Sequence, residues 1–242
     1  MGKGGAGKQH IEATPSHVAE LLRIFETMRE QSASEEKRLV ASNWTFVCSE
    51  TTLHRFITAN NCDVSAAREQ LLWHLRWKEE YRVGDVLQED FTDMFARNEM
   101  YWMGTDKAGH PVLVWNAARH DGSEVSKERY GRFFVHLLER GQRDFFGGDE
   151  RPGQFAVLVN AKGFGRRNID FGMMRSAGPV IELNYPERQY RTYVLSVGPL
   201  ITFAWGVVSK FLDPGTVFKI RLAGGFDDAA LLEDFTPDQV QV

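Results

Sequence analysis

The first third of the chain has the hydrophobic pattern of amphipathic helices. Apolar residues recur three and four positions apart in three segments, which are residues 14–30, 49–60 and 63–81. Thr14 and Asp63 suit the N-caps of two of these helices, and Pro15 suits a first helical turn. The polar residues 32–38 predict a link. An inward-facing stripe of the last helix comprises Val64, Ala67, Leu71 and Leu75.

From residue 100 onward, short apolar runs alternate with helical segments. Residues 100–104 and 111–118 predict the strands of a hairpin. The continuous apolar run 154–160 is typical of a strand buried on both faces. Further strands are predicted at 189–197 and 218–223, and further helices at 126–146 (capped by Ser126), 169–184, 201–212 and 227–235. This order predicts an α/β fold with a mostly parallel sheet, one apolar face of which needs a cover.

The segment 201–212 is apolar around most of its helical circumference. Its apolar residues are Ile201, Phe203, Ala204, Trp205, Val207, Val208, Phe211 and Leu212. A surface helix needs an apolar stripe of only about 100°. At about 18 Å the segment is too short to cross a hydrocarbon core of about 30 Å. Two interpretations stay open: a cover over an apolar surface, or a helix buried in a large α/β core.

Composition narrows the class of protein. The 242 residues are 43% hydrophobic and 26% charged, which is typical of a soluble globular protein. A net charge of −4 argues against nucleic acid as the main partner. Cys48 and Cys62 lack the spacing of a metal site or a disulfide framework, and no signal peptide precedes them, so we expect reduced thiols and a cytoplasmic location.

Known catalytic and cofactor motifs are missing from the sequence. Seven histidines are scattered without metal-ligand spacing, and no Gly-x-Ser-x-Gly nucleophile motif occurs. Residues 2–9, "GKGGAGKQ", resemble a phosphate loop but end on Gln9 and follow no strand. We therefore expect neither an enzyme nor a metal or nucleotide cofactor.

The order of the motifs resembles a known family. The segment "TTLHRFITANNCDVSAAREQLLWHLRWKEEY" is similar to the helical leader of CRAL-TRIO proteins, the Sec-fourteen-like lipid transfer proteins. "GTDKAGHPVLV" resembles their first hairpin and "VNAKGFG" the end of their central strand. "NYPERQYRTYVLSVGPLITFAWGVVSKFLDPGTVFKI" is the most specific match. The resemblance runs from about residue 50 to 235 and suggests three parts: a flexible tail over 1–13, a helical subdomain over 14–84 and a CRAL-TRIO domain over 85–242.

The resemblance implies a sheet that floors an apolar cavity holding one lipid, closed by a gate helix from Pro199 to Leu212. The bound phospholipid would then be the only ligand, the protein would act as a monomer, and contact with membranes would be transient. One side of the gate would touch acyl chains and the other would meet the bilayer when the gate opens. This favours the covering interpretation of the apolar helix.

The resemblance also implies a head-group site. Glu187, Thr216 and Lys219 match the positions that the family associates with an inositol phosphate head group. Asp213 suits the cap of a short helix that begins at Pro214, and Thr216 lies in its first turn. Phosphatidylinositol is therefore the leading ligand. The competing interpretation is an ordinary capped turn with a structural ion pair.

Two departures from the family pattern bear on this site. Asn60 and Asn61 stand where the family usually has basic residues, so a contact made there is lost or is replaced by Arg55 or Arg221. Phe155 and Val157 stand where hydroxyl residues are tied to choline lipids, and neither side chain donates a hydrogen bond. We expect weak or absent choline-lipid binding.

Other functions of the same fold stay open. The ligand is alternatively a tocopherol-like or retinoid-like molecule, a sterol, or haem, for which the axial candidates are Tyr185, Tyr190 and Tyr193. The chain is alternatively a lipid-sensing regulatory module that does not transfer. A basic rim that attracts anionic lipid would comprise Arg166, Arg167, Arg188, Arg191 and Lys210.

Overall fold

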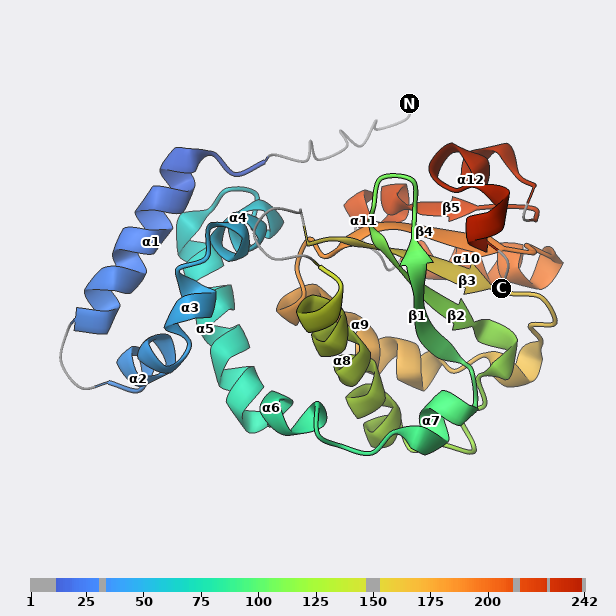
Figure 1. The fold of residues 1–242 in the computed structure, drawn as a ribbon, viewed down its shortest axis with the longest axis horizontal. Coiled ribbons are helices and arrows are strands. Elements are labelled where there is room, and N and C mark those ends of the chain that lie inside the picture. The colour runs from blue at the N-terminus through green and yellow to red at the C-terminus, as the bar shows by residue number, and fades with distance from the viewer. Residues whose placement is uncertain (1–11, 31–33, 147–152, 211–213, 226, 241–242) are drawn as a thin grey trace, which may run out of the picture.

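The computed structural model describes residues 12–30, 34–146, 153–210, 214–225 and 227–240. Figure 1 shows a group of helices beside an α/β part that contains the sheet. The expected tail over 1–13 lies almost entirely outside the described residues.

The helical part is built on α1 (Pro15–Glu30), α4 (Glu50–Ala59) and α5 (Val64–Glu80). The inward stripe predicted for α5 is confirmed, since Ala67, Leu71 and Leu75 are fully buried and the half-buried Val64 packs against the same cluster. They pack in one cluster with Leu21 and Phe25 of α1. This cluster gives the helical part a core of its own.

The predicted polar link over 32–38 is wrong from residue 35 onward. There the chain forms α2 (Glu35–Ser42), followed by the short α3 (Trp44–Val47). Ser34 caps α2 through the Lys37 amide, and Leu39 and Val40 are fully buried. Tertiary burial of two apolar side chains therefore overrides a locally polar sequence. Two further short helices, α6 (Val83–Val86) and α7 (Thr92–Ala96), lead into the sheet.

The sheet has five strands in the order β1-β2-β3-β4-β5. They are β1 (Met100–Thr105), β2 (Pro111–Asn116), β3 (Phe155–Asn160), β4 (Gln189–Leu195) and β5 (Ile220–Leu222). The β1–β2 hairpin is antiparallel and the remaining pairs are parallel. The prediction of a mostly parallel sheet is confirmed.

Helices connect the parallel strands. After the 3₁₀ turn η1 (Ala117–Arg119), α8 (Lys127–Asp144) joins β2 to β3. The turn η3 (Arg166–Asn168) and α9 (Phe171–Asn184) join β3 to β4, and α10 (Pro199–Val208) and α11 (Pro214–Lys219) join β4 to β5. The apolar helix therefore ends at Val208 rather than at Leu212, and the strand predicted from 218 starts at Ile220 because α11 continues to Lys219. Phe211, Leu212 and Asp213 lie outside the described residues.

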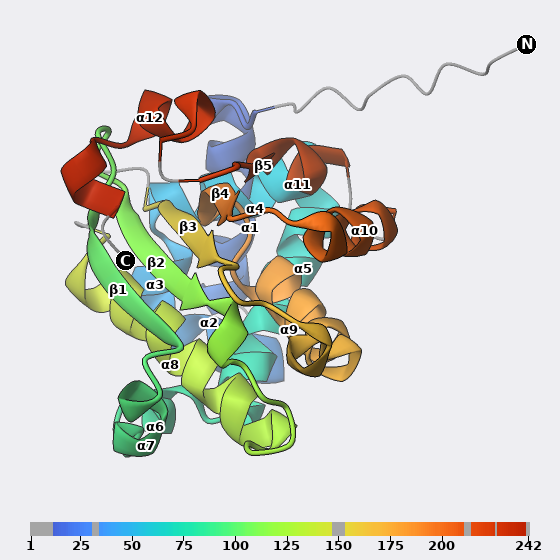
Figure 2. The same cartoon turned by 90° about the vertical axis from the view of Figure 1, so that its right-hand side faces the viewer.

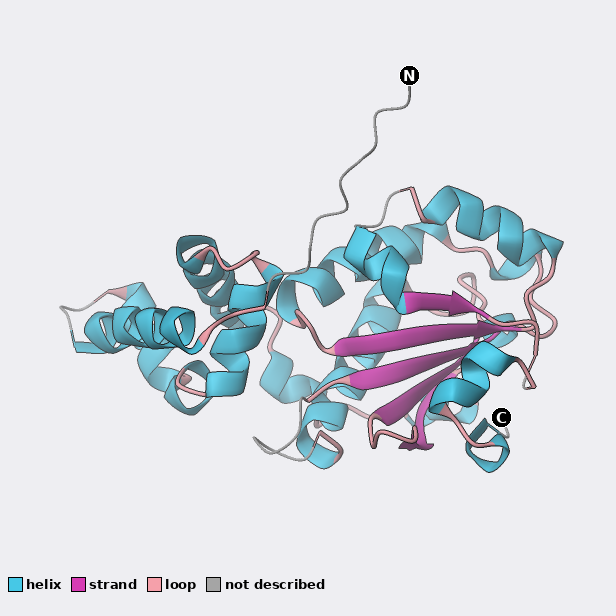
Figure 3. Cartoon of the chain, turned by 90° about the horizontal axis from the view of Figure 1, so that it is seen from above, coloured by secondary structure: helices cyan, strands magenta, loops and turns pink. Residues whose placement is uncertain are grey.

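Helices lie on both sides of the sheet (Figure 3). On one face Val114, Leu158 and Tyr193 pack with Leu231 of α12 (Ala229–Asp234) and Val240 of η4 (Pro237–Val240). On the other face Leu113 and Phe155 pack with α8. Figure 2 shows α9 and α10 together on the side away from α12.

Candidate functional site

The sheet face that includes Val157 is covered unevenly. At its β2 side Leu113 is buried under the cluster that contains α8. At its β4–β5 side four aliphatic side chains are only half-buried: Val157, Val194, Ile220 and Leu222. Strand pairing places these residues on a common face, because Val157 pairs with Thr192, which pairs with Ile220, and Val194 pairs with Leu222. We call these four residues the open apolar face.

The helices that follow β4 expose large apolar side chains. Phe203 on α10 is 72% exposed and Phe218 on α11 is 71% exposed, and Val207 is also exposed. Ile201 and Trp205 are half-buried, so α10 is neither a core helix nor a helix with a polar outer surface. Exposed apolar patches of this kind mark contact sites for ligands, membranes or partners. Val208 is the last residue of α10.

Glu187 and Lys219 form an ion pair at the amino ends of β4 and β5. Lys219 Nζ lies 2.9 Å from Glu187 Oε2. Glu187 precedes β4 with a left-handed φ of 56°, and Lys219 is the last residue of α11 before β5. Adjacent parallel strands start at the same edge of a sheet, which brings these two residues together. Thr216 lies on α11, three residues before Lys219.

Arg55 of α4 contacts the turn that precedes Glu187. Its guanidinium is buried and donates to the carbonyl oxygen of Pro186 at 3.1 Å. Burial is the main cause that lowers the pKa of Arg55 well below its usual value, and the charge of Arg188 lowers it further. Arg55 therefore fixes the turn that carries Glu187 from the helical part of the protein.

Asn60 makes contacts away from the ion pair. It ends α4, and its amide nitrogen donates to the carbonyl oxygen of Phe56 at 2.8 Å and to the Gln70 side chain. Gln70 in turn donates to the carbonyl oxygen of Leu183 on α9 at 2.9 Å. The structure thus uses Asn60 in the contact of α4 with α5, and its role toward a head group stays a prediction.

A sequence model of the CRAL/TRIO domain matches residues 97–242, which include the whole sheet and α8 to α12. The chain belongs to the CRAL/TRIO domain family. This confirms the family suggested by the ordered motifs. The structure agrees with the assignment: its fold is similar to the crystal structure of Sfh5, with a TM-score of 0.64, 14% identity and coverage of 88% of this chain and 82% of that one.

Curated relatives support the same family. The chain is 25% identical over 261 aligned positions to the phosphatidylinositol/phosphatidylcholine transfer protein SFH4 of Arabidopsis thaliana, with 97% of this chain and 41% of SFH4 covered. It is 23% identical over 195 aligned positions to SFH7, a protein of the same description and organism, with 74% and 36% covered. The chain therefore spans less than half the length of these two relatives.

Two of the five arginines and lysines expected on a basic rim make contacts within the CRAL/TRIO domain, and the rim itself stays a prediction. Arg188 donates to the carbonyl oxygen of Gly153 at 2.8 Å and to Gln142 at 2.9 Å, and burial lowers its pKa to about 10. Arg191 pairs with Asp234 at α12, on the other face of the sheet. Side chains alternate along β4, which points Arg191 toward α12, and the turn before β4 sets the direction of Arg188. The positions of charged residues in the sequence reveal neither direction.

The tyrosines considered for haem have other contacts in this structure. Tyr185 donates to Glu139 at 2.8 Å, and Tyr193 donates to Asp234. Burial raises the pKa of both phenols. Tyr190 stacks on His110 with ring centroids 4.1 Å apart. These contacts give the phenols structural roles.

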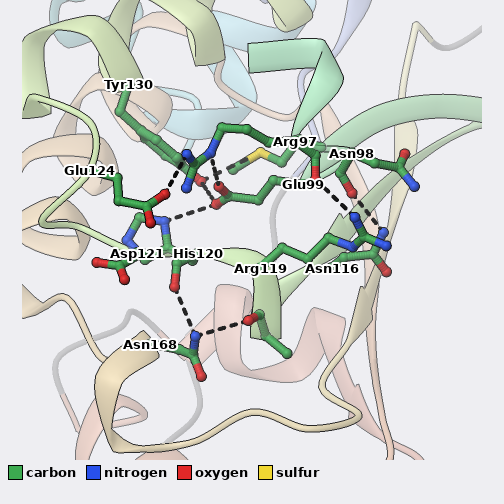
Figure 4. A network of polar contacts seen from close by, with 12 residues as sticks. Arg97, Asn98, Glu99, Asn116, Arg119, His120, Asp121, Glu124, Tyr130 and Asn168 are labelled. Atoms are coloured by element: carbon green, nitrogen blue, oxygen red, sulfur yellow. Dashed lines mark hydrogen bonds and ion pairs between the residues drawn. The ribbon is translucent and has the colours of Figure 1, made fainter. Parts of the chain in front are cut away.

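Figure 4 shows a polar network in the CRAL/TRIO domain that no sequence motif indicates. Glu99 Oε1 accepts from His120 Nδ1 and from the Tyr130 hydroxyl, each at 2.8 Å. All three residues are buried. Glu99 raises the pKa of His120, chiefly through this hydrogen bond. His120 Nε2 lies 3.7 Å from Asp170, which caps α9 through the Met173 amide. The network ties α9 to α8, and the sequence separations of these residues follow no motif.

Within the described ranges no helix is both long and apolar enough to cross a bilayer. The same residues contain no group of three or more His, Cys, Asp or Glu side chains arranged to hold a metal ion.

Proposed function

We propose that this CRAL/TRIO protein binds one lipid on the open apolar face and transfers or presents it between membranes, with phosphatidylinositol as the ligand. One observation carries the proposal: Val194, Ile220 and Leu222 of the open apolar face lie on β4 and β5, and Glu187 and Lys219 lie just before the same two strands. The names of SFH4 and SFH7 support it, because both are described as phosphatidylinositol/phosphatidylcholine transfer proteins.

The open apolar face suits acyl chains. Each methylene moved from water onto such a surface contributes about 0.8 kcal/mol, so two acyl chains favour an apolar site over water by tens of kcal/mol. The exposed Phe203 and Val207 place apolar surface on α10 where a gate would meet a bilayer. Carried lipid and membrane lipid then have similar free energies, and exchange needs no nucleotide. The proposed activity involves no catalytic residue.

The Glu187–Lys219 pair suits an inositol phosphate. A carboxylate accepts hydrogen bonds from ring hydroxyls, and an ammonium binds a phosphate as a point charge. Both side chains are about one-fifth exposed, so a ligand reaches them without unfolding the site. Thr216 on α11 and Arg55 behind the turn complete the proposed site. Asn60 is proposed as a second contact from the helical subdomain.

The direct test is native mass spectrometry of the purified chain, followed by organic extraction and identification of the lipid. One bound phospholipid with an inositol head group would support both the apolar face and the polar site. A bound sterol, tocopherol-like molecule or haem would support the apolar face as a ligand site and refute the head-group assignment. No ligand, with no uptake from phosphatidylinositol vesicles, would refute the proposal.

Transfer is tested separately from binding. Donor vesicles that contain fluorescent phosphatidylinositol and unlabelled acceptor vesicles report movement of lipid between membranes. Uptake without delivery would indicate a lipid-sensing module in place of a carrier. We further propose that the protein acts as a monomer in the cytoplasm and touches membranes transiently. Sedimentation without vesicles would report the oligomeric state, and sedimentation with vesicles would report membrane contact.

A further inference from the structure

A polar pocket lies at the opposite end of the strands from the Glu187–Lys219 pair. Its volume is about 280 Å³, and its lining residues are Asn98, Tyr101, Asn116, Ala118, Arg119, Asn160 and Lys162. Asn116 ends β2 and Asn160 ends β3, so the pocket lies at the carboxyl edge of these parallel strands. Ligands of open α/β sheets commonly bind at this edge.

The pocket also lies on the other face of the sheet. Asn116 and Asn160 continue the alternation of Val114 and Leu158, which pack toward α12. The open apolar face, which includes Val157, points the other way. The polar pocket is therefore separate from the proposed lipid site both along the strands and across the sheet.

Carboxamides give this pocket a fixed floor. Asn116 Nδ2 donates to the carbonyl oxygen of Asn98 at 3.0 Å, and Asn160 Nδ2 donates to Asn116 Oδ1 at 3.1 Å. Asn160 Oδ1 accepts the backbone amide of Lys162, also at 3.1 Å. Figure 4 shows Asn98, Asn116 and Arg119 meeting at this place. This chain of hydrogen bonds holds Asn98 and the ends of β2 and β3 in one geometry.

The rim of the pocket is positively charged. Arg119 donates one guanidinium N–H to the carbonyl oxygen of Arg97 at 3.1 Å, which holds it in place while its other donors remain available. In the part of the chain that the structure describes, neither Arg119 nor Lys162 pairs with a carboxylate, and both are exposed. The nearby Glu99 carboxylate is buried and bonded to His120 and Tyr130. The lining thus carries two cations and no acid.

We propose that this pocket binds a phosphate monoester. Arg119 follows β2 and Lys162 follows β3, so the two cations approach a ligand from different loops. A phosphate monoester carries close to two negative charges and three oxygens, which allows it to contact both cations at once. The phenol ring of Tyr101 supplies a surface for the organic part of the ligand.

Isothermal titration with glycerol 3-phosphate tests the proposal on the full chain. We expect saturable binding that weakens as salt rises and that is at least tenfold weaker in the double variant Arg119→Gln, Lys162→Met. The matched control is Arg23→Gln, Lys37→Met, which removes one arginine and one lysine from the helical part. Equal binding by the two double variants would overturn the proposal. Lactate binding as tight as that of glycerol 3-phosphate would overturn the assignment to phosphate.

A second arm identifies the source of the phosphate group. The same proteins are sedimented with phosphatidylcholine vesicles that do or do not contain phosphatidic acid. Loss of vesicle binding in the pocket variant alone, without soluble binding by the wild type, would assign the site to a lipid head group. Soluble binding assigns it to a free phosphate ester. No phosphate-dependent binding in either arm would refute the site, whereas phosphatidylinositol transfer is expected to continue unchanged in the pocket variant.

Discussion

Lys219 Nζ lies 2.9 Å from Glu187 Oε2, although the two residues are 32 positions apart in the chain. Each residue lies just before a strand of the parallel pair β4–β5. The pair is therefore formed before any ligand arrives, and it is positioned by the sheet rather than by a mobile loop. A head group that binds here replaces the contact between Glu187 and Lys219 with contacts from these two residues to its own hydroxyls and phosphate.

Replacement of Lys219 tests the polar half of the proposed lipid site. We expect Lys219→Met to lower phosphatidylinositol transfer at least tenfold, because the phosphate loses its cation. The melting temperature should change little, since partly exposed ion pairs contribute about 0–1 kcal/mol. The measurement is fluorescent lipid transfer combined with thermal unfolding. Lys37→Met, in the helical part, is the control, and wild-type transfer by Lys219→Met would refute the head-group role.

Replacement of Phe203 tests the gate. Because this ring is 72% exposed, Phe203→Asp should leave the fold intact. A carboxylate on the face that meets the bilayer should slow lipid exchange several-fold. Thr202→Asp places the same charge at the neighbouring exposed polar position of α10 and serves as the matched control. Exchange rates that are equal in the two variants would show that the apolar side of α10 has no special role.

Lipid selectivity is tested on the open apolar face. The ring of Phe155 is buried and stacks on Phe146 at 5.8 Å, whereas Val157 is half-buried. Val157→Thr therefore adds a hydroxyl where a ligand can reach it, and we expect it to raise phosphatidylcholine uptake above the low wild-type level. Val159→Thr, two residues along the same face, is the control. Strong phosphatidylcholine uptake by the wild type would contradict the expected selectivity.

The His120–Glu99 pair predicts a pH dependence of stability. The pKa of His120 is raised from its usual 6.5, so the protonated form is favoured in the folded state. The contribution of His120 to the free energy of unfolding is fully present below about pH 6 and is lost as the pH rises through the raised folded pKa. In urea unfolding, His120→Gln should therefore lower the free energy of unfolding more at pH 5.5 than at pH 8.5. Tyr130→Phe keeps the ion pair and should retain the wild-type pH dependence; an identical loss for His120→Gln at both pH values would refute this prediction.

Local sequence signals were sufficient for most elements of the fold. Asp63 and Ser126 cap α5 and α8 as their positions predicted, because an N-cap depends on a few neighbouring residues. The continuous apolar run at 154–160 predicted β3, the central strand. The polar start of α2 misled the prediction, since the burial of Leu39 and Val40 is a tertiary effect.

The sequence by itself thus determined the α/β alternation, the parallel sheet and an apolar helix after β4, because periodicity and caps act within a few residues. Only the tertiary structure decided which charged residues meet. It paired Glu187 with Lys219, turned Arg191 to Asp234 on the other face, and joined His120 to Glu99. Strand register and the direction of each side chain set these contacts, and neither is encoded in sequence spacing.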